Sequence, residues 1–161
     1  MLREVEGDVF EALKARTGAT VFLHGCNAQG GMGAGVAKIV KERYPIAYEE
    51  YREACLDAKT GGDSVMGDVI FSFVERDAEH PLIIANGITQ EWYGRDPERR
   101  YACPDAISSV IRDVESEWGT TTHLVAVRVG AGYGGLDWEE DVKPLFEESR
   151  YQWTVYYLDT A

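Results

Sequence analysis

The sequence predicts an α/β fold, a three-layer α/β/α sandwich in which helices cover both faces of a mainly parallel or mixed central sheet. Apolar runs of strand length alternate with amphipathic segments of helix length, which is typical of this class. Two predicted strands, 21–26 and 123–129, each run into a glycine-rich loop that leads into a helix. Ligands bind outside the carboxyl ends of the strands in such sheets. The same pattern therefore predicts where the functional site lies.

The strands are predicted from short apolar or alternating runs that end in glycine, proline or polar residues. Residues 2–6 alternate apolar and charged side chains, and Gly7-Asp8 end this strand. Two apolar runs, 68–75 and 81–86, are separated by a polar turn, which indicates two strands joined directly. The full predicted set is 2–6, 21–26, 68–75, 81–86, 123–129 and 153–158.

The helices are predicted from apolar residues at helical spacing. A short helix is expected from Asp8 to about Lys14. The next begins at Gly35, Pro45 ends or kinks it, and a more charged helix covers roughly 46–58. Pro104 begins a helix whose apolar face is formed by Ile107, Val110, Ile111, Val114 and Trp118. A last amphipathic helix is indicated by Trp138, Val142, Leu145 and Phe146.

Length and composition indicate a single domain, 1–161, with 45% hydrophobic residues. The net charge of −12 repels a nucleic-acid backbone, so general DNA or RNA binding is not expected. A small anionic ligand remains possible because backbone N–H groups bind phosphate without lysine or arginine.

No apolar run approaches the roughly 20 residues of a membrane span. The sequence also begins without the apolar stretch of a signal peptide, which predicts a cytoplasmic protein.

The three cysteines, Cys26, Cys55 and Cys103, are odd in number and show no close pairing, which favours a reducing compartment. Neither they nor the three histidines have the spacing of a metal site. No metal and no cofactor are therefore expected.

Two glycine-rich loops, 27–35 and 130–135, are predicted to hold a diphosphate through backbone N–H groups. Glycine permits the close approach and the positive φ angles that such loops need. The first loop does not fit the GxGxxG dinucleotide pattern with its acidic residue in the next strand, and no GxxxxGK[ST] is present. Both of these nucleotide-binding classes are therefore disfavoured.

Five side chains beside these loops are candidates for chemistry or recognition. His24 is either a core histidine bonded to backbone or an acid or base at the rim of the phosphate site. Asn27 either caps a turn or hydrogen-bonds a sugar hydroxyl. Asp8 either caps a helix or accepts a hydrogen bond from an exocyclic amine. Cys26 is interpreted as a buried filler. Asp137 alone among the acids at 137–141 lies close enough to the second loop to act in chemistry.

The segment 86–101 is long, polar and aromatic, which is more typical of a functional loop than of a simple connection. Trp92 and Tyr93 are expected to cover a sugar or base. Three arginines stand out in this acidic chain, and each either neutralises neighbours such as Asp96 and Glu98 or contacts ligand: Arg95, Arg99 and Arg100.

These motifs, taken in order, resemble those of a macrodomain over nearly the whole chain. The stretches that carry the resemblance are EGDVF, LHGCNAQGGMGAGVAKIVKERYP, MGDVIF, ANGITQEWYGRD, VRVGAGYGGLDWEEDVKPLF and WTVYYL. Macrodomains are α/β/α modules that bind ADP-ribose. HGCNAQGGMGAGVA and TQEWYGRD are most similar to the yeast-type ADP-ribose-1″-phosphate phosphatases and their bacterial and phage relatives. The implied partner is ADP-ribose or its 1″-phosphate, bound by a monomer.

The resemblance implies a role for each matching residue. Asp8 would recognise the adenine amine, Asn27 would lie by the distal ribose, and Tyr133 would lie against that ribose. His24 and Asp137 are the catalytic candidates. The implied ligand-binding residues are Asp8, Val9, Asn27, Gly33, Ala34, Gly35, Val36, Asn86, Thr89, Gly130, Ala131, Gly132, Tyr133 and Gly134.

Two departures bear on the activity. Relatives that remove ADP-ribose from protein carboxylates or DNA use a lysine where this chain has Gln90. The protein-directed relatives also carry an aspartate where it has Gly134. The leading hypothesis is therefore a hydrolase, a phosphatase acting on ADP-ribose-1″-phosphate, in which His24 activates water or protonates the leaving oxygen. One alternative is a binder that sequesters ADP-ribose or a derived signal without turnover. Another is an ADP-ribosyl hydrolase acting on modified protein or nucleic acid.

Overall fold

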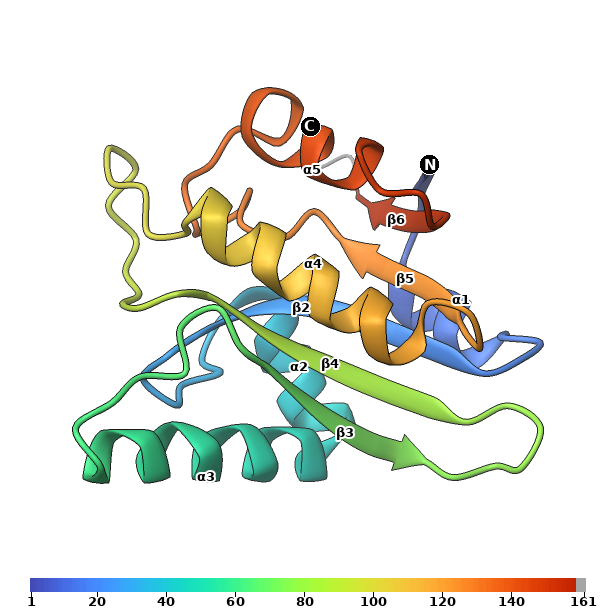
Figure 1. Cartoon of the computed structure of the whole chain (residues 1–161), viewed down its shortest axis with the longest axis horizontal. Helices are drawn as coiled ribbons and strands as arrows, with labels where there is room; N and C mark the ends of the chain where they lie inside the picture. Colours follow the sequence, from blue (N-terminus) through green and yellow to red (C-terminus); the bar gives the residue numbers. More distant parts are fainter. Residues whose placement is uncertain (159–161) are drawn as a thin grey trace.

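A six-stranded mixed sheet lies between two layers of helices in the computed structural model, which describes residues 1–158 (Figure 1). The strand order is β1-β6-β5-β2-β4-β3, and β3 runs antiparallel to β4 while the other neighbouring pairs are parallel. The predicted α/β/α sandwich is confirmed. Residues 159–161 of the predicted domain lie outside the described part. Within residues 1–158, no helix is both long and apolar enough to cross a membrane.

The strands are β1 (Leu2–Glu6), β2 (Thr20–Asn27), β3 (Val69–Glu75), β4 (Leu82–Gln90), β5 (His123–Val127) and β6 (Trp153–Tyr157). The helices are α1 (Val9–Lys14), α2 (Gly35–Arg43), α3 (Pro45–Thr60), α4 (Pro104–Trp118), the π-helical η1 (Trp138–Val142) and α5 (Lys143–Glu147). Pro45 lies in the first turn of α3. Proline is tolerated there because the N–H groups of the first turn make no hydrogen bond within the helix.

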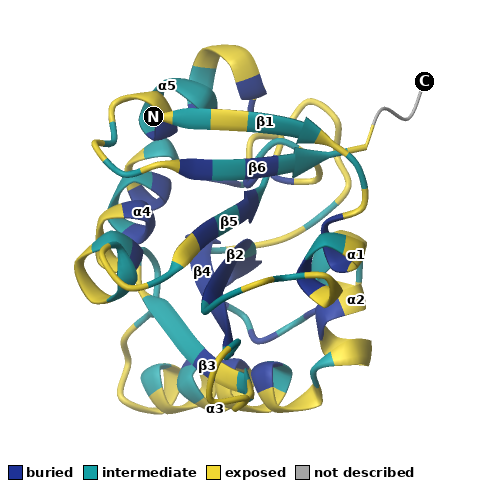
Figure 2. Ribbon diagram, turned by 90° about the vertical axis from the view of Figure 1, so that its right-hand side faces the viewer, coloured by how far each residue is buried: buried dark blue, intermediate teal, exposed yellow. Residues whose placement is uncertain are grey.

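The two helical layers bury the central strands on both faces, as the dark strands β2 and β4 in Figure 2 show. Val21 and Leu23 of β2 belong to the core on the α4 face. Phe22 and Cys26 belong to the core beneath α1, α2 and α3. This alternation is the period of two that a strand imposes, and burial of both faces explains why β2 reads as an almost continuous apolar run.

β4 continues to Gln90, four residues beyond the strand end expected at Asn86. Gly87, which directly follows the predicted end, lies inside the strand. A Cβ at Gly87 would lie 2.5 Å from Val110 Cγ1 and 2.9 Å from Leu23 Cδ1. The glycine is needed because α4 packs directly on the strand at this point. β4 therefore stays paired with β2 up to the Asn27–Gln90 pair.

The last helical segment differs from the single helix expected over 138–146. It is divided into the π-helical η1 and the short α5. Pro144 lies in the first turn of α5, where its missing N–H is tolerated, whereas an uninterrupted helix from Trp138 would need that donor. β5 also ends at Val127, two residues earlier than expected, because the chain turns there into the second glycine loop.

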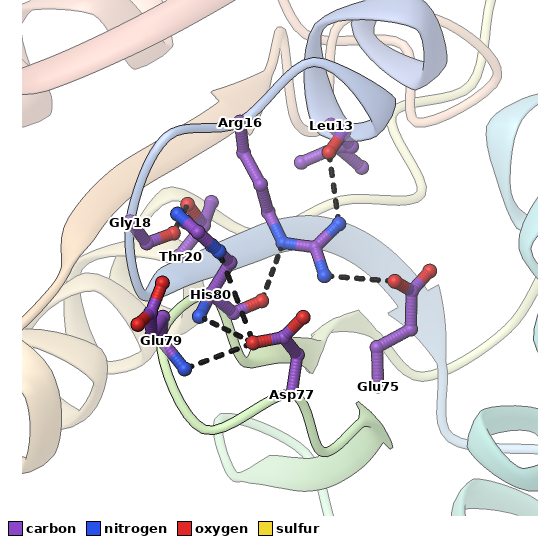
Figure 3. Close-up of polar contacts among 8 residues, drawn as sticks. All are labelled: Leu13, Arg16, Gly18, Thr20, Glu75, Asp77, Glu79 and His80. Atoms are coloured by element: carbon purple, nitrogen blue, oxygen red, sulfur yellow. Dashed lines mark hydrogen bonds and ion pairs between the residues drawn. The ribbon is translucent and has the colours of Figure 1, made fainter.

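Arg16 joins three segments at the amino end of the sheet (Figure 3). Its Nε donates to the His80 carbonyl at 2.8 Å, and its Nη1 donates to the Leu13 carbonyl at 3.0 Å. Its Nη2 lies 2.7 Å from a carboxylate oxygen of Glu75. The Arg16 side chain is only 10% exposed, whereas that of Glu75 is 46% exposed. The two partly buried contacts with carbonyls therefore carry most of the stabilisation.

Replacing Arg16 with methionine should lower the free energy of unfolding by about 1–3 kcal/mol, because two carbonyls lose a charged donor. Glu75→Gln is the matched control and should change it by less than about 1 kcal/mol, since an exposed ion pair contributes little. Urea unfolding followed by tryptophan fluorescence measures both. Equal effects of the two substitutions would contradict this assignment.

Candidate functional site

A cleft of about 1380 Å³ crosses the carboxyl ends of β1, β6, β5, β2 and β4. The structure brings together fourteen of the sixteen residues that the sequence predicted for the site. They are Asp8, Val9, Asn27, Gly33, Ala34, Gly35, Val36, Thr89, Gly130, Ala131, Gly132, Tyr133, Gly134 and Asp137. His24 and Asn86 do not line the cleft.

Asn27 and Tyr51 shape the first glycine loop. Asn27 Nδ2 donates to the Gly31 carbonyl at 2.9 Å, and its Oδ1 accepts from the Gln29 N–H at 2.9 Å. The Tyr51 hydroxyl donates to the same Oδ1 at 3.0 Å. Burial raises the pKa of Tyr51, so this hydroxyl remains a donor. The Asn27 amide therefore holds the loop in shape, while its predicted contact with the distal ribose stays a prediction.

The second glycine loop is closed by its own backbone. Gly130 adopts a φ of 78°, and its carbonyl accepts from the Leu136 N–H at 2.9 Å. A Cβ at Gly134 would lie 2.5 Å from the Gly130 carbonyl oxygen. The Gly134 carbonyl in turn accepts from the N–H groups of Tyr101 at 2.8 Å and Ala102 at 2.9 Å. The loop thus tolerates no side chain at Gly134 without rearrangement.

The β4–α4 loop, residues 91–101, forms the end of the cleft beside β4. An antiparallel bridge between Gln90 and Ala102 closes its base. Trp92 and Tyr93 are 57% and 65% exposed, and Tyr93 Cε1 would lie 4.0 Å from a Cβ at Gly31. This loop therefore places the exposed Tyr93 ring beside the first glycine loop, whereas Trp92 does not line the cleft. The covering of a sugar or base by these rings stays a prediction.

Asp8 and Asp137 are the two exposed carboxylates predicted for the site, and each caps a helix. Asp8 Oδ1 accepts from the Phe10 N–H at 2.8 Å at the start of α1. Asp137 Oδ1 accepts from the Glu140 N–H at 2.9 Å at the start of η1. Both line the cleft, Asp8 after β1 and Asp137 directly after the second glycine loop. Each carboxylate retains a second oxygen for a ligand or water.

No family model matches the chain. The chain is similar to an ADP-ribose 1″-phosphate phosphatase of Neosartorya fischeri, with 41% identity over 54 residues. That match spans 34% of this chain and only 25% of the fungal protein. A phosphatase of the same name from Candida albicans is 22% identical over 163 residues, which cover 98% of this chain and 100% of the relative.

Two solved structures resemble the whole described fold. A macrodomain protein from Streptomyces coelicolor superimposes with a TM-score of 0.74 at 24% identity, covering 98% of this chain and 99% of that one. The chain has the macrodomain fold. DarTG from Thermosipho africanus, solved in complex with ADP-ribose, aligns with a TM-score of 0.68 at 22% identity over 96% of this chain and 41% of its own.

His24 lies in the core of this fold, away from the cleft. It is fully buried, its ring stacks on Phe22 with centroids 6.0 Å apart, and its Nε2 lies 2.8 Å from Asn86 Oδ1. Asn86 Nδ2 donates to the Ile70 carbonyl at 3.0 Å. The strand period of two turns His24 into the helical layer with Phe22 and Cys26. Of the two interpretations of His24, the structure therefore has the core histidine. Its partner is the Asn86 side chain and not a backbone group. We assign neither His24 nor Asn86 a contact with ligand.

Gln90 and Gly134 are the two positions that the sequence analysis singled out as departures from the lysine-dependent relatives. Gln90 Nε2 donates to the Trp92 carbonyl at 2.7 Å, so the amide is used to shape the β4–α4 loop. An aspartate has no room at Gly134, as its packing on Gly130 shows. Neither position therefore supplies an acid or a base to the cleft.

Arg128 is a cleft residue that the sequence analysis did not single out. Its guanidinium lies 4.0 Å from the Tyr157 ring centroid and 3.2 Å from a carboxylate oxygen of Glu4. Burial alone would raise the pKa of Glu4, but hydrogen bonds from Lys143, Trp138 and Arg128 hold it below its ordinary value. One feature of the sequence could have identified Arg128, because it is a charged residue near the carboxyl end of a predicted strand, where ligands bind.

Burial lowers the pKa of His24 to about 4, below the ordinary value near 6.5 of an unfolded chain. Between these two values the unfolded state binds more protons, so lowering the pH favours unfolding. We expect the free energy of unfolding to fall by about 2 kcal/mol from pH 7.5 to pH 5. Urea unfolding at the two pH values measures this. A His24→Gln variant should lose this part of the pH dependence, and an equal slope in the variant would contradict it.

Gly134→Ala should destabilise the fold by about 1–3 kcal/mol, because its Cβ overlaps the Gly130 carbonyl. Gly132→Ala is the matched control in the same loop, since a Cβ there meets no atom within 4 Å. Differential scanning calorimetry of the two variants should show a lower Tm only for Gly134→Ala. Similar melting temperatures would mean that the loop adjusts without strain.

Proposed function

We propose that this macrodomain binds ADP-ribose and removes the terminal phosphate of ADP-ribose-1″-phosphate. The observation that carries the proposal is the meeting of two glycine loops at one cleft, from the neighbouring strands β5 and β2. Two such loops offer backbone N–H groups to a diphosphate from both sides. The name of the fungal relatives and the ADP-ribose bound to Thermosipho africanus DarTG support the choice of ligand.

The strand order suggests how the ligand lies. Asp8 follows β1, the second loop follows β5, the first loop follows β2, and the β4–α4 loop follows β4. Adenine at Asp8 places the diphosphate between the glycine loops and the distal ribose near Tyr133 and Thr89. The carboxylate of Asp8 accepts from the adenine amine and repels phosphate, which favours this direction over the reverse.

Asp137 is the proposed base for hydrolysis. A water molecule held by its carboxylate attacks the terminal phosphorus and passes its proton to Asp137, while the bond from phosphorus to the ribose oxygen breaks and that oxygen takes a proton from solvent. The glycine loops contribute by holding the substrate in place before reaction. His24 has no part in this scheme, since it is buried in the core.

Binding without turnover is the second candidate, and the engagement of the polar side chains in the cleft favours it. Asn27 and Gln90 donate to backbone carbonyls, and one oxygen of Asp137 caps η1. Hydrolysis of ADP-ribosylated protein or nucleic acid is disfavoured by Gln90 and Gly134, which supply no acid or base.

Phosphorus NMR of ADP-ribose-1″-phosphate with the purified protein tests the proposal. Wild-type protein should release inorganic phosphate, and Asp137→Asn should slow the release by about 10²-fold or more, the usual contribution of a general base. The asparagine retains an oxygen for the Glu140 N–H, so the fold is kept. Glu139→Gln, on the exposed side of η1, is the control and should match the wild type.

The other results of this experiment are equally informative. A shifted but intact substrate spectrum would support the binder without turnover. Unchanged release by Asp137→Asn would remove Asp137 from the mechanism. An unshifted spectrum would overturn the proposed ligand.

A further inference from the structure

We infer that Arg95 binds the terminal phosphate and gives the cleft its preference for ADP-ribose-1″-phosphate over ADP-ribose. The inference rests on the proposed function and names the group that would distinguish the two ligands. Arg95 belongs to the β4–α4 loop and lines the cleft. The two ligands differ only by a phosphate that carries roughly 1.5–2 negative charges at neutral pH, so a free cation at the correct end of the cleft decides between them.

Arg95 lies at the end of the cleft that this phosphate would occupy. In the strand order β1-β6-β5-β2-β4-β3, the strands β5 and β2 that lead into the glycine loops lie between β1 and β4. The β4–α4 loop therefore lies on the other side of both glycine loops from Asp8, which follows β1. The Arg95 guanidinium lies 5.2 Å from the centroid of the Tyr133 ring. Tyr133 Cδ2 in turn would lie 4.0 Å from a Cβ at Gly35, at the start of α2. Arg95 is therefore placed where the second and first glycine loops meet.

Arg95 is also a cation without a carboxylate partner. Among residues 1–158 no ion pair involves it, and it is exposed to solvent. The neighbouring Asp96 directs its Oδ1 to the Glu98 N–H at 3.0 Å, within the loop. Arg100 of the same loop is paired with Asp141 at 2.7 Å. Arg95 can thus bind an anion without first breaking an ion pair.

The other cations of the cleft are engaged elsewhere. Arg128 pairs with Glu4 on the β1 side. Lys41 and Arg43 lie toward the last turn of α2, six to eight residues from Gly35 and so roughly 9–12 Å along the helix axis. They lie over the rings of Tyr48 and Phe10. None of the three is placed beside Tyr133, where the distal ribose is proposed to lie.

Tyr101 holds the backbone on both sides of Arg95. Its hydroxyl accepts from the Asp96 N–H at 3.3 Å, and its ring packs so closely on Gly94 that a Cβ there would overlap it. The Gln90–Ala102 bridge closes the base of the loop. Arg95 is therefore held at its backbone by Tyr101 and at its guanidinium by the Tyr133 ring. A planar guanidinium on an aromatic face retains its edge for two hydrogen bonds to a phosphate.

The test compares the binding of ADP-ribose and ADP-ribose-1″-phosphate to wild-type protein, Arg95→Gln and Arg99→Gln. Stopped-flow tryptophan fluorescence reads binding before turnover interferes. Arg99 is the matched control because it belongs to the same loop but lies over Tyr101 and does not line the cleft. Wild type and Arg99→Gln should bind the 1″-phosphate at least tenfold more tightly than ADP-ribose. Arg95→Gln should lose this preference, with its affinity for ADP-ribose changed less than twofold.

Each remaining outcome overturns the inference in a distinguishable way. If Arg95→Gln keeps the preference, another group binds the terminal phosphate. If it weakens both ligands equally, Arg95 acts on the fold or on the diphosphate. A wild type that binds ADP-ribose without preference overturns the role of Arg95 while leaving ADP-ribose binding in place. A wild type that binds neither ligand overturns the proposed function together with the inference.

Discussion

The parallel pairing of β2 with β4 and β5 is the constraint on which the rest of the structure depends. It brings the carboxyl ends of three strands to one edge of the sheet, and the two glycine loops and the β4–α4 loop follow from those ends. Gly25 and Gly87 lie opposite each other in this pairing. Gly87 admits α4 on one face, and a Cβ at Gly25 would lie only 3.0 Å from Thr89 Oγ1. The close packing of α4 on β4, and of the Thr89 side chain against β2, therefore depends on two positions without side chains.

A polar pair inside this apolar centre makes the pairing specific. His24 and Asn86 are opposite each other in the register of β2 and β4, and their side chains hydrogen-bond where water has no access. A shift of the register by one residue would place the two side chains on opposite faces of the sheet and leave buried polar groups without partners. The pair thus favours one alignment of the two strands whose ends build the cleft.

The cleft suits the proposed anionic ligand although the protein as a whole is strongly acidic. The net charge is −12, yet the carboxyl ends of the central strands are lined by glycine and other small residues. Backbone N–H groups keep their partial positive charge whatever the composition of the surface. In the proposed scheme a cation without a carboxylate partner is needed only to distinguish ADP-ribose-1″-phosphate from ADP-ribose. In the proposed complex the backbone of the glycine loops provides the general binding of the diphosphate, and the side chain of Arg95 provides the selection between ligands.

The sequence by itself determined the order and type of the elements, because the strand and helix periods follow directly from which residues are apolar. It also indicated both glycine loops and most of the cleft residues, since those positions follow strands and parallel strands end at one edge. It was unable to place His24, because a residue near a strand end faces either the cleft or a helical layer, and only the register and the packing of Phe22 decide which. The continuation of β4 past Gly87, the lack of space at Gly134 and the seating of Arg95 on Tyr133 were likewise decided by the tertiary structure. Each of them depends on contacts between segments far apart in the chain, which no local pattern records.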